Sequence, residues 1–415
     1  MRLITTVLTL VFSFQAYATT HDNHPPHLPL ELTFEESLNL GKQFKKLKNF
    51  STLSSEIQAS IRGGEKMNQW MQEVNSNRPA DQKIRLTSKG TRRGIPVDKP
   101  SKYGPSTIKQ KYNELNKDMP ASLRDVIYGN RSTSKSLPVA DDVFVTWARQ
   151  VSRLYQTAVR WQGSVPYLSF YAGRRRDDVR GYYHLKNLPD ADQKLSQYAT
   201  LDQAEQGQIK EWLEGLCFNT QEEDDLCERE FKKYLGRDDL VGMKNRYWNR
   251  AKSVWNHFFQ ITGPRRDVTW SAKNPNEMRV PFKSISEQRI ADWLKENVEG
   301  EFQRPLKNWE MLVDYKRGGW GTAKLKFQAG VTPHVTGGNT IVMDRNVSID
   351  EYTVQWTIRH EFGHILRLPD CYVEFYDERA KLMINYQLDT TDLMCSRAGD
   401  MNDRIYNELK RVYFN

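Results

Sequence analysis

Two histidines and a glutamate stand close together near the C-terminal end of the chain, as His360, Glu361 and His364. On a helix, residues four apart lie on the same face with Cβ atoms roughly 5–6 Å apart, so both imidazole rings can hold one ion. Zinc bonds histidine nitrogen at about 2.0–2.1 Å and, in catalytic sites, takes three protein ligands and one water molecule. The spacing therefore predicts a Zn²⁺ site in which Glu361 accepts a proton from the activated water.

The segment before these histidines is expected to form the helix that holds them. Ser348 is a suitable N-cap, and Asp350 in the first turn suits the positive end of the helix dipole. A largely apolar stripe follows at helical spacing, formed by Tyr352, Gln355, Trp356, Ile358, Arg359, Phe362, Ile365 and Leu366. Because Pro369 cannot continue a helix, the chain should turn after Arg367 and leave Asp370 free to return towards the metal.

The motif resembles the signature of the metzincin metalloproteases, His-Glu-x-x-His-x-x-Gly-x-x-His or Asp. Asp370 stands at the last position of this pattern, which is similar to the snapalysin-type variant with aspartate as third zinc ligand. The family also has a methionine turn beneath the metal, and residues 391–395 match that part, with Met394 as the turn residue. The resemblance covers the last third of the chain and implies a mixed twisted sheet, an active-site helix and a Met-turn.

One position departs from the family pattern. Arg367 stands where the family has glycine, which ends the helix in a left-handed conformation without a Cβ penalty of roughly 1 kcal/mol. Either Arg367 adopts that conformation or the turn has another shape. Glu374 and Glu378 are the alternative third ligands, because some zincins take a glutamate from further along the chain; spacing and the helix stop at Pro369 favour Asp370.

The chain has four cysteines, which allow three disulfide pairings. We favour Cys217–Cys227, which closes a short loop, and Cys371–Cys395. The second bond would join the residue after Asp370 to the residue after Met394, and so fix the third-ligand loop to the Met-turn in a site that must be rigid. No cysteine has metal-ligand spacing to another, so a Cys/His zinc site has little support.

The N-terminal residues have the pattern of a secretory signal peptide. Arg2 precedes an apolar core at residues 3–14, and residues 16–18 form a small-x-small cleavage site. Cleavage after Ala18 would place the protein in a secreted or periplasmic location, where disulfides persist. We expect residues 19–29 to form a flexible N-terminus, and no later stretch is apolar enough to span a bilayer.

The chain is basic, with a formal net charge of +9. A basic exported protein adheres to anionic surfaces, so the cell envelope is an expected partner. The sequence contains no helix-turn-helix, zinc-finger or RNA-binding signature, and nucleic acid is therefore not expected as a partner.

Helical and strand-like patterns divide the chain into successive parts. We expect a helical segment and linker at 30–110, in which Thr33 and Glu36 form a capping box, and a helical domain of unknown role at 111–270. A metzincin-like catalytic domain is expected at 271–415. The fold class that follows is α+β, with a helical N-terminal region before the sheet-containing domain.

The last domain is expected to alternate strands and helices. Strand-like runs occur at 278–282, 309–315, 323–329 and 340–343, and a helical run occurs at 284–301. This order is compatible with what the metzincin resemblance implies. In that family an edge strand above the cleft binds the substrate backbone by strand addition, and the candidate here is 330–335, which includes His334.

The resemblance implies a zinc-dependent endopeptidase with a protein or peptide substrate. In this interpretation Glu361 is the general base, Met394 supports the site, and Tyr406 is a candidate stabiliser of the oxyanion. Residues 30–270 would be a targeting module, a substrate-binding module or a pro-domain. Two alternatives stay open: an envelope-binding protein with a structural zinc held by four protein ligands, and a zinc amidase that acts on peptidoglycan.

Overall fold

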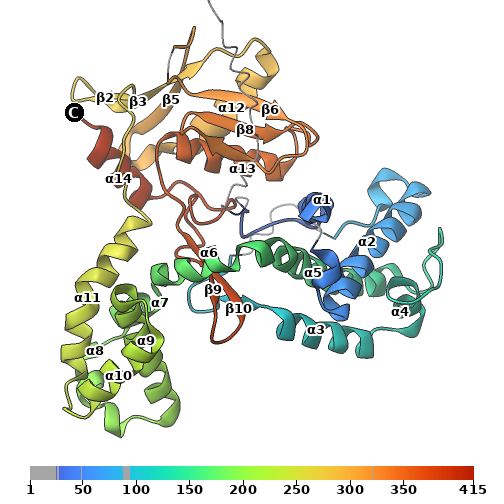
Figure 1. Ribbon diagram of the computed structural model, residues 1–415. Coiled ribbons are helices and arrows are strands. Elements are labelled where there is room, and N and C mark those ends of the chain that lie inside the picture. The colour runs from blue at the N-terminus through green and yellow to red at the C-terminus, as the bar shows by residue number, and fades with distance from the viewer. Residues whose placement is uncertain (1–24, 26–27, 48, 87–93, 320) are drawn as a thin grey trace, which may run out of the picture.

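The computed structural model describes residues 25, 28–47, 49–86, 94–319 and 321–415 (Figure 1). The predicted signal peptide and most of the predicted N-terminal segment 19–29 lie outside the described residues. Helices dominate the earlier part of the chain and strands are concentrated in the later part, so the predicted α+β class is confirmed. Over the part of the chain that the structure describes, no helix is both long and apolar enough to cross a membrane.

The first group of helices, which we call the N-terminal bundle (residues 28–173), packs around the long helix α5. Its helices are α1 (Phe34–Phe44), α2 (Ser55–Ser76), α3 (Pro105–Asp118), α4 (Ala121–Ile127), α5 (Asp141–Ser164) and α6 (Leu168–Gly173). The rings of Phe34 and Tyr155 pack edge to face in its core, with centroids 5.5 Å apart. The predicted capping box at the start of α1 is confirmed, because Thr33 and Glu36 each accept the other's backbone N–H.

A second group of helices, the helical arm (residues 180–257), forms a separate core. Its helices are α7 (Arg180–Asn187), α8 (Ala191–Ser196), α9 (Gln203–Gln221), α10 (Asp224–Leu235) and α11 (Leu240–His257). The apolar residues Leu213 and Met243 are fully buried in this core. The sulfurs of Cys217 and Cys227 are bonded and join α9 to α10, as the pairing from the sequence predicted.

The C-terminal part contains a mixed sheet on which α12 and α13 pack side by side. Its elements are β2 (Thr269–Ser271), β3 (Asn274–Lys283), α12 (Gln288–Glu301), β4 (Gln303–Arg304), β5 (Trp309–Lys316), β6 (Lys324–Gln328), β7 (His334–Thr336), β8 (Thr340–Asp344), α13 (Tyr352–Ile365) and α14 (Asp403–Tyr413). Each predicted strand and the predicted helix of this part overlap an observed element. The predicted edge segment 330–335 is only partly a strand, because the observed strand β7 begins at His334.

The strands of this sheet run mainly parallel. β3 pairs with β5 and β6 pairs with β8 in parallel, and the parallel bridge between Phe282 and Ala323 joins the two pairs. β7 pairs with β8 antiparallel at one edge, with His334 opposite Val342. The resulting order is β4-β5-β3-β6-β8-β7, with β2 beside the start of β3.

A second, smaller sheet joins the N-terminal bundle to the C-terminal part. It consists of β1 (Ser101–Tyr103), β10 (Leu382–Gln387) and β9 (Tyr372–Asp377), all antiparallel, with Tyr103 opposite Met383. In Figure 1 the β9–β10 hairpin reaches away from the main sheet towards the helices. We expected 30–110 to consist of a helical segment and a linker, but strand β1 lies within it, because β10 offers a free strand edge that a sequence pattern does not reveal.

Buried charges hold this hairpin between the two helical groups. On one side Arg160 of α5 donates two hydrogen bonds to the Glu374 carboxylate, at 2.8 and 3.0 Å, and the Tyr103 hydroxyl donates a third at 3.0 Å. On the other side the Tyr386 hydroxyl donates to Asp178 at 2.7 Å. The hairpin that begins two residues after Asp370 is therefore fixed on one face by Arg160 of the N-terminal bundle and on the other by Asp178, which lies just before the helical arm.

Candidate metal centre

The helix that holds the two histidines is α13, and it begins later than the sequence suggested. Glu351 is its N-cap and makes no side-chain capping bond. The Ser348 hydroxyl instead accepts a hydrogen bond from the Asp350 N–H at 3.3 Å, within a turn that precedes the helix. The prediction of Ser348 as N-cap is therefore wrong, because a serine can satisfy its own local turn in competition with a helix.

The end of α13 is a reversal built around a left-handed residue. Arg367 has a φ of +66°. Its N–H donates to the His364 carbonyl at 3.0 Å, and the Leu368 N–H donates to the Gly363 carbonyl at 3.1 Å, which is the paired pattern of a Schellman motif. Arg367 therefore adopts the conformation that glycine would supply, the first of the two outcomes considered from the sequence.

The side chain of Arg367 packs against the turn between β7 and β8. A Cβ atom built on Gly338 would lie 1.9 Å from the Arg367 Nη1 atom, so a glycine there leaves room for the guanidinium group. Gly338 itself has a φ of +66°, which glycine adopts at little cost. This contact links the end of helix α13 to the turn that follows the edge strand β7.

Both histidine rings of α13 are oriented by backbone carbonyl groups. The Nδ1 atom of His360 lies 2.8 Å from the Leu393 carbonyl oxygen, and that of His364 lies 2.9 Å from the Leu368 carbonyl oxygen. A carbonyl oxygen can only accept, so each Nδ1 carries the proton and each neutral ring keeps a lone pair on Nε2. Such backbone anchoring is typical of histidines that bind metals.

The two Nε2 atoms face Asp370. Its Oδ1 atom lies 3.2 Å from His360 Nε2 and 3.3 Å from His364 Nε2. Atoms bonded to one tetrahedral zinc ion at about 2.0–2.1 Å are roughly 3.3 Å apart, so the spacing fits that ion. Two groups of side chains among the described residues could hold a metal ion. One of them contains the bonded cysteines Cys371 and Cys395, and the other consists of His360, His364 and Asp370. Three protein donors leave one tetrahedral position for water or substrate.

The charges around His364 favour a cation. Burial lowers the pKa of His364, but the neighbouring Asp370 carboxylate outweighs burial and raises this pKa from 6.5 to about 9. Glu361 acts in the same direction as Asp370. A metal ion must compete with a proton for this nitrogen, so metal binding releases a proton and weakens as the pH falls.

Glu361 lies beside the two histidines in a closed environment. The residue is 3% exposed, and its Oε2 atom is buried without a hydrogen-bond partner among the described residues. A buried carboxylate oxygen without a protein partner is costly, and here it lies beside two histidines whose Nε2 atoms face a candidate ligand. Its place next to His360 and His364 suits a base that takes a proton from water.

The two alternative third ligands do not join this cluster. The Glu374 carboxylate accepts hydrogen bonds from Arg160 and Tyr103, where the β9–β10 hairpin meets the N-terminal bundle. Glu378 is exposed in the turn between β9 and β10. Of the three candidates from the sequence, Asp370 is thus the one that the fold brings to the histidines.

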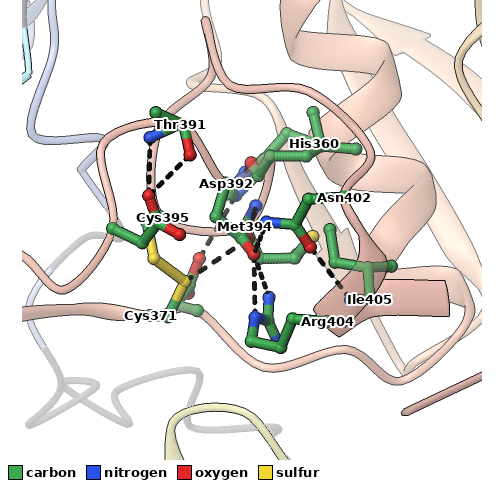
Figure 2. Close-up of a disulfide and its surroundings, with 12 residues drawn as sticks. His360, Cys371, Thr391, Asp392, Met394, Cys395, Asn402, Arg404 and Ile405 are labelled. Atoms are coloured by element: carbon green, nitrogen blue, oxygen red, sulfur yellow. Dashed lines mark hydrogen bonds and ion pairs between the residues drawn. A yellow bond between two sulfur atoms is a disulfide. The ribbon is translucent and has the colours of Figure 1, made fainter. Parts of the chain in front are cut away.

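The predicted Met-turn lies directly beneath the histidines, and a disulfide attaches it to the third-ligand loop. The sulfurs of Cys371 and Cys395 are bonded, as predicted. The Cys371 N–H also donates to the Met394 carbonyl oxygen at 3.1 Å. Met394 is completely buried. Figure 2 shows His360, the disulfide and Met394 gathered around the same turn.

A buried aspartate organises this turn from inside. Asp392 has no exposed surface, and its Oδ1 atom accepts the Met394 N–H at 2.8 Å. Its Oδ2 atom accepts hydrogen bonds from Asn402 at 2.7 Å and from Arg404 at 2.8 Å (Figure 2). The carboxylate is thus satisfied on both oxygens, so the turn is rigid and holds the Leu393 carbonyl oxygen under His360.

The glycine within the helical motif is required by close packing. A Cβ atom built on Gly363 would lie 2.2 Å from the Met394 sulfur and 3.0 Å from its terminal methyl carbon. The helix and the turn therefore approach to a distance that no other residue permits without movement.

Two residues singled out from the sequence lie elsewhere in the molecule. Tyr406 packs its ring against Trp270 and Trp309, with centroids 5.9 and 5.3 Å apart, in the core beneath α14, and gives no support to a role at the oxyanion. His334 lies in the edge strand β7, where its Nδ1 atom lies 2.8 Å from the Thr332 carbonyl oxygen. The ligand cluster among the described residues is formed by His360, His364 and Asp370, without His334.

Two other residues lie beside the site and were missed. Tyr372 and Arg397 line the same small cavity as His360 and Glu361. Burial and the nearby carboxylates, first Asp370, raise the pKa of Tyr372 well above its ordinary value, so its phenol stays protonated. The position of Tyr372 shortly after Asp370 was a usable signal, whereas nothing in the sequence marks Arg397.

Comparisons of the chain with protein-family models, curated proteins and solved structures give no match.

Proposed function

We propose that this chain is an exported zinc-dependent endopeptidase of the metzincin type. The observation that carries the proposal is the convergence of His360 Nε2, His364 Nε2 and Asp370 Oδ1 at separations of 3.2 and 3.3 Å, with both rings oriented by backbone carbonyls. The unpartnered carboxylate oxygen of Glu361 beside them adds a base. Two disulfides suit an exported protein.

The arrangement of the C-terminal part also supports this class. Strand β3 is followed by helix α12, strands β5 and β6, the antiparallel edge strand β7, strand β8 and the histidine helix α13, which is the order that the metzincin resemblance implies. Strand β7 is at the sheet edge next to α13. An extended peptide can add to this edge through backbone hydrogen bonds, and a peptide substrate is therefore favoured over a glycan amide.

Each residue of the site has a role in the proposed reaction. Zinc held by His360, His364 and Asp370 would supply Lewis-acid chemistry, because it acidifies a water molecule and polarises the scissile carbonyl. Glu361 takes the proton of that water and then delivers it to the leaving amine. The protonated phenol of Tyr372 is the candidate donor to the oxyanion in place of Tyr406.

The alternative with a structural zinc requires a fourth protein ligand. Among the described residues, the cluster of donor atoms contains His360, His364 and Asp370 alone, which supports an open coordination position. An unpartnered buried base also has no purpose in a purely structural site.

Zinc content and cleavage, measured together, test the proposal. The wild-type chain should bind one zinc ion and cleave an unfolded, alkylated protein in a chelator-sensitive reaction. Glu361→Gln should keep the zinc and lose cleavage by about 10²–10⁴-fold, because glutamine cannot accept the proton. Asp370→Ala should lose zinc, and Glu378→Gln is the matched control that should change neither. Full cleavage by Glu361→Gln, or a chain that binds no zinc, contradicts the proposed mechanism.

A further inference from the structure

A short segment before α1 crosses the opening of the candidate site. We call residues Leu28–Thr33 the strap. Pro29, Leu30 and Glu31 of the strap close a cavity together with His360 and Glu361, and this cavity has a volume of about 10 Å³. Such a space holds about one water molecule. A substrate chain therefore cannot reach Glu361 while the strap is in this position.

Two arginines hold the strap through its backbone. Arg160 donates to the Pro29 carbonyl oxygen at 2.8 Å, and Arg397 donates to the Glu31 carbonyl oxygen. The Ser396 hydroxyl donates to the Glu31 carboxylate at 2.7 Å. Ser396 and Arg397 directly follow the Met-turn, so the strap is held beside the candidate metal site through its own backbone carbonyl groups and the Glu31 carboxylate.

The strap runs between two larger hollows. One has a volume of about 740 Å³ and the other about 780 Å³, and Leu32, Thr33 and Arg397 line both. The second hollow is bounded by residues 331–333, which lead into the edge strand β7. Helix α1 lies between α13 and α5 in Figure 1, and its Gln43 side chain donates to the Gly330 carbonyl oxygen at 2.8 Å. The strap and α1 thus occupy the groove below the edge strand where a peptide is expected.

Two carboxylate oxygens are left unsatisfied by this arrangement. The Oε1 atom of Glu31 and the Oε2 atom of Glu361 are both buried without a hydrogen-bond partner among the described residues, and both residues line the same small cavity. A water molecule in this cavity can donate to these oxygens, so the strap covers a small polar space beside the two histidines. The arginine and serine contacts named above hold the strap over that space.

We propose that the strap is a built-in inhibitory segment that lies in the position of a substrate chain, so that the protein is latent until the strap is displaced or cut. This inference rests on the proposed peptidase function. It assigns the cover over Glu361 to Leu28–Thr33, which leads directly into α1, and not to residues 30–270 as a whole, because β1 of the N-terminal bundle is paired into a sheet with β9 and β10. The strap belongs to no sheet, and its release breaks the contacts named above, a longer hydrogen bond from Arg160 to the Leu28 carbonyl oxygen at 3.4 Å, and the burial of the Leu28 side chain.

A strap variant tests the proposal without reference to catalysis. Pro29→Gly/Leu30→Gly/Glu31→Gly removes the carboxylate that Ser396 binds and makes the segment more flexible. Diethyl pyrocarbonate modifies accessible histidines, and the rate at His360 is followed by mass spectrometry in metal-free protein. We expect a rise of at least about tenfold at His360 in the variant. His334 in the edge strand is the internal control, and Glu31→Gln, which keeps an acceptor for Ser396, should resemble the wild type.

The same variants, loaded with zinc, report on latency. The triple-glycine chain should lose zinc to a chelator about tenfold faster and cleave an unfolded protein at least about tenfold faster than the wild type, with unchanged circular dichroism. Equal rates of His360 modification in the wild type and the variant overturn the strap proposal, whatever the cleavage result. Faster modification and faster zinc loss without any cleavage support the strap as a cover and count against the peptidase function instead.

Discussion

The C-terminal part and the helical arm each contain one disulfide, and the two bonds have different structural roles. In the C-terminal part, Cys371–Cys395 ties the residue after Asp370 to the residue after Met394. In the helical arm, Cys217–Cys227 joins α9 to α10 within an apolar core. The first bond lies next to Asp370, so a small displacement of this bond would move a candidate metal ligand. The second bond fixes how helices α9 and α10 pack. A disulfide therefore affects the chemistry of a site only through the residues that it holds in position.

The interiors of the two parts differ in the same way. The helical arm buries mainly apolar side chains, such as Leu213 and Met243. The C-terminal part also buries Asp392, Glu361 and His360. Buried polar groups specify a geometry only when they are satisfied, as Asp392 is. Glu361 differs from Asp392, because one of its carboxylate oxygens has no partner among the described residues.

The largest expected effect comes from breaking the ion pair between Arg160 and Glu374, which joins the N-terminal bundle to the C-terminal part. Arg160→Met leaves Glu374 in a joint where its side chain is 11% exposed, without its ionic partner. We expect the free energy of unfolding in denaturant to fall by about 3–5 kcal/mol, because an uncompensated buried charge is left behind. Arg160→Met/Glu374→Leu should recover most of this loss. An equal loss in both variants would show that the ion pair does not join the parts.

Removing each disulfide sharpens the comparison directly. Cys217→Ala/Cys227→Ala and Cys371→Ala/Cys395→Ala should each lower the free energy of unfolding by about 3 kcal/mol, because the cost of closing a loop grows only with the logarithm of its length and the sequence separations are 10 and 24. Only the second variant should also bind zinc more weakly, by about 10–100-fold, because it loosens the Asp370 loop. Zinc affinity is measured by competition with a chromogenic chelator. A similar loss of affinity in the first variant would erase the proposed difference between the bonds.

A pair of glycines extends the comparison to packing. Gly363→Ala places a methyl group against the Met394 sulfur, so thermal unfolding should show a loss of about 1–3 kcal/mol. Gly207→Ala in α9 meets no atom within 4 Å and should stabilise the chain by about 0.5–1 kcal/mol, because alanine favours the helix. Opposite signs are expected from the same chemical change. Two changes of the same sign contradict the close approach of α13 to the Met-turn.

The smallest effect concerns the end of α13. Arg367→Gly relieves a left-handed arginine, a gain of about 1 kcal/mol, but removes the packing of its guanidinium group on Gly338. We expect the two contributions to cancel to within about 1 kcal/mol in thermal unfolding. A larger stabilisation would mean that the arginine is kept for a purpose other than stability.

Local rules of the chain explain what could be predicted from the sequence. The spacing of His360 and His364, the stop at Pro369 and the capping box at Thr33 each depend on neighbours a few residues away, and the structure agrees with all of them. The pairing of Cys371 with Cys395 followed from the third-ligand and Met-turn positions that they flank.

The parts that were missed depend on contacts between distant residues. Glu31 meets Ser396 across 365 positions, and Ser101 pairs with Asn385. No periodicity or spacing encodes such meetings, because they result from how the bundle and the sheet pack. The same holds for Arg397, whose role depends on Glu36 and Glu31 from the far end of the chain. The predicted domain boundaries and the predicted export remain expectations from the sequence.

The pairing of β1 with β10 also sets an order of events. Ser101–Tyr103 are made early during synthesis, yet their partners are Met383 to Asn385, near the end of translation. Closing a loop of this length is slow compared with forming local helices. The N-terminal bundle and the helical arm can therefore form their helices first, while the small sheet waits for the last strands. In this order of folding the candidate metal centre forms late, and the strap has already been synthesised before Glu361 is added to the chain.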